Sequence, residues 1–132
     1  MKTAITVFSK ILNREELILA VNKIISILTR NNVERVEISF GFMWGRDGEE
    51  WIDYDVSTAE ISERIENEEN LNNGKLGKDD FWISIKELEV QILFCHESDI
   101  HLCYNSENYI TQAILEKWEE KNIIQTKKVN RV

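Results

Sequence analysis

The sequence contains no proline and only five glycines in 132 residues. Without proline, helix interiors are not interrupted, and the composition indicates no linker. Residues 1–132 are therefore expected to form one domain. The basic C-terminal residues 127–132 are expected to form a frayed tail. The few glycines leave little turn chemistry for a phosphate-binding loop, and the sequence contains neither a dinucleotide fingerprint nor an HExxH motif. Nucleotide-dependent chemistry is therefore not predicted.

Long apolar runs and cysteines are also scarce. No run approaches the roughly 20 apolar residues that a membrane-spanning helix needs. The start, MKTAITVFSKILNREE, lacks the uncharged core and the cleavage site of a signal peptide. Two cysteines make a thin disulfide framework, which favours free thiols in a reducing compartment. We therefore expect a cytoplasmic protein that does not bind membranes.

Basic residues are nearly absent from one segment of this acidic chain, whose net charge is −8. Residues 47–69 contain ten acidic residues and one basic residue, Arg64, which gives a net charge of −9, whereas the remaining residues sum to +1. Such a surface would repel nucleic acid and anionic membranes, and it would attract a basic protein or a cation. We therefore expect a basic protein partner and no nucleic-acid partner. Separately, no motif in the sequence predicts a cofactor.

A hydrophobic fraction of 42% favours a folded core, and the spacing of apolar residues predicts an α+β fold. Helical spacing indicates helices at 14–30, at 58–69 and after Asn105 or Ser106. Period-two alternation indicates strands at 3–9, 36–44, 52–56, 81–85, 88–94 and 100–104, and 123–126 is a candidate short edge strand. Because hairpins follow one another, the order β-α-β-β-α-β-β-β-α predicts a single, mainly antiparallel sheet of about five to six strands with three helices.

Local signals predict where several elements begin. Asn13 with Glu16, and Ser57 with Glu60, match the capping-box pattern at the starts of the first two helices. The pair Asp47-Gly48 is typical of a tight turn between the second and third strands. The sequence therefore predicts where the first two helices begin and where the first hairpin turns.

Both cysteines and both histidines lie within residues 88–104. Strand parity predicts a hairpin in this stretch, with Glu97, Ser98 and Asp99 as a three-residue loop. The opposite pairs predicted by this register are Phe94 with Leu102, Ile92 with Tyr104, Cys95 with His101 and Leu93 with Cys103. The hairpin would therefore place both thiols and one imidazole on the same face of the sheet.

Thiolate and imidazole groups are zinc ligands, so Cys95, His101 and Cys103 are candidate metal ligands, with Asp99 as a candidate fourth. The spacing differs from that of zinc fingers, and both cysteines alternate with large apolar residues, so two buried thiols are the simpler interpretation. A nucleophilic Cys95 with His101 as its base is the corresponding enzymatic hypothesis, although a strand offers no helix N-terminus to activate the thiol. Whether the protein is an enzyme is left open, and no catalytic residue is assigned.

The segments FWISI at 81–85, VQILFCHESDIHL at 90–102 and ILEKWEE at 114–120 resemble small bacterial proteins of the toxin-immunity type. The resemblance implies a cytoplasmic single-domain protein that binds a cognate toxin domain and blocks its active site or substrate surface. Many such toxins are basic nucleases, which an acidic inhibitor suits through electrostatic complementarity. No functional residue is carried over from the resemblance.

The predicted partner surface combines aromatic anchors with the acids in and around the first hairpin. Its residues are Trp44, Asp47, Glu49, Glu50, Trp51, Asp53, Asp55, Glu60 and Glu63. The simpler interpretation is that the tryptophans cover the sheet and the acids keep the protein soluble. The alternative functions are a small zinc-binding or cysteine-dependent enzyme centred on Cys95, His101 and Cys103, and a self-associating accessory protein, with monomer and homodimer both open.

Overall fold

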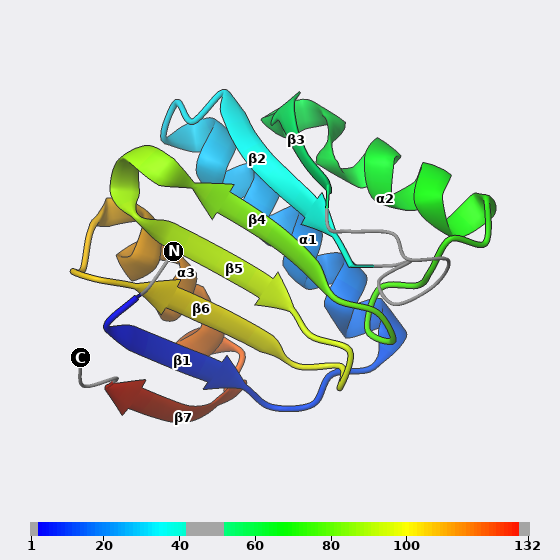
Figure 1. The fold of residues 1–132 in the computed structure, drawn as a ribbon. Helices are drawn as coiled ribbons and strands as arrows, with labels where there is room; N and C mark the ends of the chain where they lie inside the picture. Colours follow the sequence, from blue (N-terminus) through cyan, green and yellow to red (C-terminus); the bar gives the residue numbers. More distant parts are fainter. Residues whose placement is uncertain (1–2, 42–51, 130–132) are drawn as a thin grey trace.

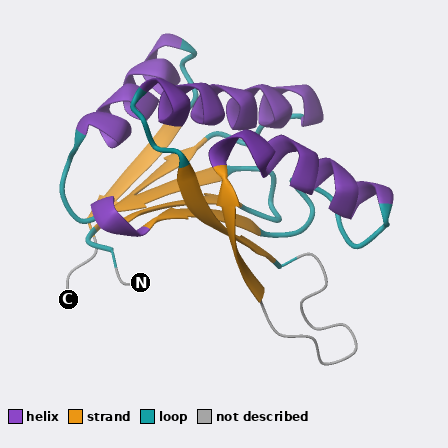
Figure 2. Ribbon diagram, turned by 90° about the horizontal axis from the view of Figure 1, so that it is seen from above, coloured by secondary structure: helices purple, strands orange, loops and turns teal. Residues whose placement is uncertain are grey.

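The computed structural model describes residues 3–41 and 52–129, which form one sheet with helices on a single face (Figure 1, Figure 2). Within these ranges the helices are α1 (Arg14–Arg30), α2 (Ile61–Asn70) and α3 (Tyr109–Glu120). The strands are β1 (Ile5–Ser9), β2 (Arg35–Phe40), β3 (Ile52–Ser57), β4 (Phe81–Ile85), β5 (Val90–Phe94), β6 (Ile100–Tyr104) and β7 (Ile124–Val129). Neighbouring strands are antiparallel in the order β3-β2-β4-β5-β6-β1-β7, which confirms the predicted α+β fold.

The described sheet has seven strands, because the segment after Ile123 forms a complete edge strand rather than a short one. β7 pairs with β1 from Ile124 to Val129, so residues 127–129, for which fraying was expected, extend the sheet. As a result β1 has a hydrogen-bonded neighbour on each side, β6 and β7.

α1 begins and ends where its local sequence predicts. The Asn13 side chain accepts from the backbone N–H of Glu16 at 2.9 Å, and the Glu16 side chain accepts from the backbone N–H of Asn13 at 3.0 Å, which confirms the capping box. At the other end Asn32 adopts the left-handed conformation, with φ of 60°. The N-terminal end therefore has local capping bonds, and the C-terminal end is followed by a residue in the left-handed conformation.

α2 begins later than its sequence predicts. The Ser57 hydroxyl accepts from the backbone N–H of Ala59 at 3.3 Å, so the reciprocal bond to Glu60 that a capping box requires is not formed. Residues Thr58–Glu60 instead form a 3-10 turn, and α2 starts at Ile61. Ser57 still caps this first turn through the single bond from Ala59.

α3 also starts later than predicted, with Asn108 as its N-cap instead of Asn105 or Ser106. The Asn108 side chain accepts from the backbone N–H groups of Ile110 and Thr111 at 2.9 and 3.0 Å. Asn105 instead accepts from the backbone N–H of Ala4 at 2.9 Å. Asparagine suits either role, and in this fold Asn105 joins the segments before β1 and after β6.

The core lies between the helices and one face of the sheet (Figure 2). Alternate strand residues fill it, and each of the central strands contributes side chains that are fully buried, such as Ile38, Ile83, Ile92 and Leu102. The residues between them face away from the helices. This second face combines polar side chains, such as Ser39 and Ser84, with apolar ones, such as Leu93 and Cys103. None of the described helices combines the length and apolar character needed to cross a membrane.

An ion pair connects α2 to the start of α1. The Arg14 guanidinium donates to both carboxylate oxygens of Glu69 at 2.6 Å, and the backbone N–H of Leu76 donates to the same carboxylate at 2.9 Å. Burial opposes ionisation of Glu69, but these hydrogen bonds outweigh burial and lower the pKa of this carboxyl. The pair therefore joins α1, α2 and the loop that precedes β4.

The substitution Glu69→Gln is expected to lower the free energy of unfolding by about 1–2 kcal/mol at neutral pH, because it weakens charge-assisted hydrogen bonds in a partly exposed pair. Since the folded-state pKa of Glu69 is lowered, this contribution is present above the unfolded-state pKa and is lost as the pH falls through the folded-state pKa. Urea denaturation at neutral and acidic pH measures the difference. Glu66→Gln changes an exposed acid of the same helix, and an equal loss in that control would contradict the role of the pair.

Tyr104 is fully buried, and its hydroxyl group has no hydrogen-bond partner among the described residues. A buried polar group without a partner costs about 1–3 kcal/mol. Tyr104→Phe is therefore expected to leave the free energy of unfolding unchanged, or to raise it by about 1 kcal/mol, as measured by urea denaturation. Destabilisation by more than about 1 kcal/mol would mean that the hydroxyl makes a favourable interaction.

Candidate functional site

The acidic surface lies around the sheet edge formed by β3. We define it by four exposed acids of β3, α2 and the turn between them, none of which has an ion-pair partner within residues 3–41 and 52–129. These acids are Asp53, Glu60, Glu63 and Glu66. Of the predicted partner-binding residues, Asp53, Asp55, Glu60 and Glu63 are exposed at this edge. The others, Trp44, Asp47, Glu49, Glu50 and Trp51, lie outside the described residues.

The acids of β3 point away from the helices. Asp53 and Asp55 alternate with Val56, which is buried in the core, so strand parity turns both carboxylates to the opposite face. Asp55 lies opposite Glu37 on β2 and forms an ion pair with Arg35 at 3.1 Å. Asp53 forms no ion pair among the described residues. The pKa of Lys86 is raised mainly by its hydrogen bond to Glu37, and the charges of both β3 aspartates add to this effect.

The acids of α2 lie on the helix side of the same edge. Ile61 and Ile65 are buried in the core, and Glu63 and Glu66 on the other side of the helix are exposed to solvent. Arg64 is the single basic residue of the segment 47–69, and its guanidinium carbon lies 4.8 Å from the centre of the Tyr54 ring. The acidic surface thus extends around both sides of β3.

The opposite edge of the sheet is basic. Lys127 and Lys128 on β7 are exposed, and β7 pairs only with β1 among the described residues. The two edges of the sheet therefore differ in charge, and a basic partner would approach the β3 edge in preference to the β7 edge.

The hairpin β5–β6 forms as predicted, but its predicted register is wrong by two residues. The observed opposite pairs include Phe94 with Ile100, Leu93 with His101 and Gln91 with Cys103. The loop is His96, Glu97 and Ser98, with Ser98 in the left-handed conformation at φ of 68°. A shift of two keeps every side chain on its predicted face, because strand side chains alternate with a period of two.

Contacts with distant segments explain the observed register. The Ser98 hydroxyl donates to the carbonyl oxygen of Gly77 at 2.9 Å, and the Ser98 carbonyl accepts from the backbone N–H of Leu12 at 2.8 Å. These bonds hold Ser98 in the left-handed conformation of the loop. The carbonyl oxygen of Asp99 instead accepts from the backbone N–H of Cys95 at 2.9 Å and closes the hairpin.

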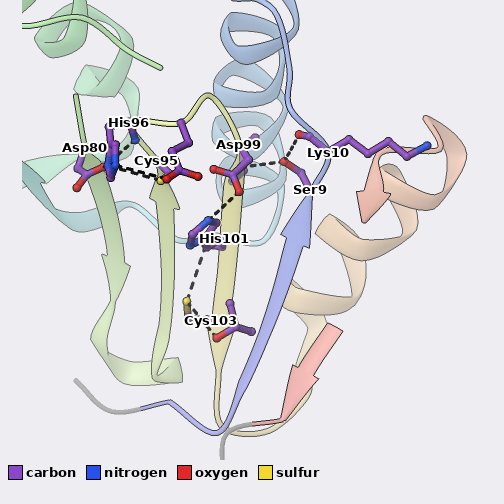
Figure 3. A network of polar contacts seen from close by, with 11 residues as sticks. Ser9, Lys10, Asp80, Cys95, His96, Asp99, His101 and Cys103 are labelled. Carbon is purple, nitrogen blue, oxygen red and sulfur yellow. Dashed lines mark hydrogen bonds and ion pairs between the residues drawn. The ribbon is translucent and has the colours of Figure 1, made fainter. Parts of the chain in front are cut away.

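Of the three predicted metal ligands, the structure brings together Cys95 and His101, with Asp99 between them (Figure 3). The Nε2 atom of His101 lies 2.9 Å from Oδ2 of Asp99. Cys103 is not part of this group. Its sulfur accepts instead from the Thr6 hydroxyl of β1 at 3.8 Å. The observed register lies two residues from the predicted one and places Cys103 farther from Cys95 along the hairpin, so the candidate ligands near Cys95 are Asp99 and His101.

Asp80 is a site residue that the sequence did not indicate. Its Oδ1 atom accepts from the backbone N–H of His96 at 2.7 Å and lies 2.8 Å from Nδ1 of the same histidine. The hydrogen bond to Asp80 raises the pKa of His96. Phe81 of β4 lies opposite Phe94 of β5, so the residues next to them in the chain, Asp80 and Cys95, are also neighbours. Predicting this contact from the sequence would have required the register of β4 against β5.

The environment of Cys95 does not suit a nucleophile. The residue is 6% exposed, and burial, reinforced by the charge of the Asp99 carboxylate, raises the pKa of the thiol to about 11. The thiol is therefore protonated at neutral pH, whereas a catalytic cysteine reacts as a thiolate. His101, the proposed base, has its Nε2 atom directed to Asp99 instead.

An apolar hollow of about 240 Å³ lies between α1 and α3. Its lining includes the apolar residues Leu19, Ile114 and Trp118 and the basic residues Lys23, Lys117 and Lys121. Small-molecule sites usually enclose about 300–1,000 Å³, so this hollow falls below their usual size. It contains none of the residues predicted to bind a partner or a metal.

No protein-family model matches the chain, and no curated protein or solved structure matches it. The resemblance to toxin-immunity proteins therefore stays a prediction, and the functional assignment depends on the acidic surface and on the side chains around Cys95.

Proposed function

We propose that this protein is an acidic binding protein of the immunity type, which binds and neutralises a basic, nuclease-like toxin domain through the acidic surface. One observation carries the proposal. Asp53, Glu60, Glu63 and Glu66 are exposed together at one edge of the sheet without ion-pair partners among the described residues. Exposed charges of one sign that are not engaged in ion pairs attract a partner of opposite charge.

Electrostatic complementarity also explains why such a partner would be selected. A uniformly acidic edge accelerates the encounter with a basic surface and disfavours acidic competitors and nucleic acid. A toxin that binds nucleic acid exposes the kind of basic surface that this edge fits. Binding there would cover the toxin's substrate surface, because substrate and inhibitor would compete for the same positive charges.

The experiment is a growth assay with the product of the gene adjacent to the gene for this protein. Expression of that product alone is expected to stop growth, and co-expression of this protein is expected to restore it. Growth arrest that persists when both proteins are folded and present would contradict neutralisation. A protein that restores growth without forming a complex would contradict binding as its mechanism.

Self-association is the second candidate, and one observation favours it. Gln125 to Val129 on β7 are exposed, and the outer backbone edge of this strand has no partner strand among the described residues. Exposed strand edges can pair with a second chain. Light scattering at micromolar concentration separates the two proposals, because a monomer would exclude self-association at that concentration.

A further inference from the structure

The turn of the β5–β6 hairpin brings a thiol, an imidazole and a carboxylate to one place (Figure 3). The ligand atoms of Cys95, Asp99 and His101 all lie within 4.8 Å of one another. Ligands of a tetrahedral zinc ion lie about 3.5 Å apart, given bond lengths of about 2.0–2.3 Å. The three side chains would therefore need to move inward only slightly, by rotation about their own bonds, to share one ion.

The carboxylate of Asp99 has an unused oxygen atom. One oxygen, Oδ2, lies 2.9 Å from Nε2 of His101. The other, Oδ1, is buried and has no hydrogen-bond partner among the described residues. Leaving a buried acceptor unsatisfied is unfavourable, and a cation placed next to it would remove that cost.

We propose that Cys95, Asp99 and His101 bind a divalent transition-metal ion of the zinc type. Sulfur, nitrogen and oxygen ligands together suit zinc, whereas calcium and magnesium prefer oxygen ligands alone. Binding would release the proton of the Cys95 thiol to solvent and form a sulfur–metal bond. Three protein ligands leave a fourth position for water or for a group from a partner. This inference is independent of the proposed toxin binding.

A neighbouring group of three, Asp80, Cys95 and His96, also has its ligand atoms within 4.8 Å of one another. The side chain of His96 is 58% exposed, compared with 21% for His101. Oδ1 of Asp80 already accepts from the backbone N–H of His96 and contacts its ring. The less exposed group, with the unsatisfied oxygen of Asp99, is therefore the better site.

Cobalt(II) is the probe, because its spectrum reports both the thiolate ligand and tetrahedral geometry. Protein freed of metal and kept reduced is expected to bind one equivalent of cobalt(II), with a thiolate charge-transfer band in the near ultraviolet, and one equivalent of zinc should displace it. The band should disappear in Cys95→Ser. In Asp99→Asn and His101→Gln the affinity should fall by about tenfold or more.

Two variants serve as matched controls, Cys103→Ser for the thiol and His96→Gln for the imidazole, and both are expected to bind cobalt(II) as the wild type does. Circular dichroism confirms that each variant is folded, and His101→Gln provides a second test if Cys95→Ser is not. Failure of the folded wild type to give the band would overturn the proposal. A band that is lost in Cys103→Ser or His96→Gln but kept in Cys95→Ser or His101→Gln would overturn it equally.

Discussion

Neutralising the acidic surface with Asp53→Asn, Glu60→Gln, Glu63→Gln and Glu66→Gln is expected to weaken binding of the basic partner by about tenfold or more at low ionic strength. The four side chains are exposed and lack ion-pair partners among the described residues, so their removal changes the electrostatic field and few internal contacts. The loss should lie mainly in the association rate and should shrink as salt is added. Surface plasmon resonance at several salt concentrations measures both quantities.

A control variant makes the same change in net charge elsewhere. It replaces four exposed acids outside β3 and α2 by glutamine, at Glu87, Glu107, Glu116 and Glu119. If the position of the charge matters, the control should lose much less affinity than the acidic-surface variant. Equal losses would mean that net charge alone attracts the partner, and the acidic surface would not be the binding site.

Replacing Gly77 by valine is expected to lower the free energy of unfolding by about 3 kcal/mol. Gly77 has a φ of +90°, which residues with a β-carbon rarely adopt. A β-carbon at this position would lie 2.6 Å from Cδ1 of Leu17 and 3.2 Å from the Ser98 hydroxyl oxygen. The substitution would therefore strain the loop before β4 and disturb the bond that anchors the β5–β6 turn. Urea denaturation measures the effect.

Gly74 is the control, because it lies in the same loop but does not have a positive φ. Among the described residues, Gly77 is the glycine that does. Gly74→Val is expected to change the free energy of unfolding by no more than about 0.5 kcal/mol. If Gly77→Val were equally mild, the close packing of the loop against α1 and the hairpin would be refuted.

Features with short-range causes could be predicted from the sequence. The bounds of α1 follow from Asn13, Glu16 and Asn32, which are all close to the helix ends that they determine. The exposure of Asp53 and Asp55 follows from strand alternation, which depends only on neighbouring residues. The α+β class follows from the same periodicities taken together.

Features with long-range causes could not be predicted. The hairpin register depends on Ser98 meeting Leu12 and Gly77, which lie far from it in the sequence. The ion pair of Arg14 with Glu69 likewise joins residues that are 55 positions apart. Strand parity was sufficient to assign each side chain to a face of the sheet. It could not distinguish registers that differ by two residues. The register determines which side chains surround Cys95.

The starts of α2 and α3 show a limit of capping signals. Ser57 and Asn105 both belong to the residue types that cap helices. Ser57 caps the 3-10 turn before α2 without the reciprocal bond from Glu60, and Asn105 binds the segment before β1. Several polar residues near a helix start can serve as its cap. At α3 the cap is Asn108, while Asn105 is bound to the segment before β1.

The most direct test of the proposed function is to map the partner's binding site by amide chemical shifts. Isotope-labelled protein is titrated with the unlabelled product of the adjacent gene, and the shifted amides are assigned along the chain. The proposal predicts that among residues 3–41 and 52–129 the largest shifts occur in β3, the turn Thr58–Glu60 and α2. Shifts confined to β7, or to the hollow between α1 and α3, would contradict it.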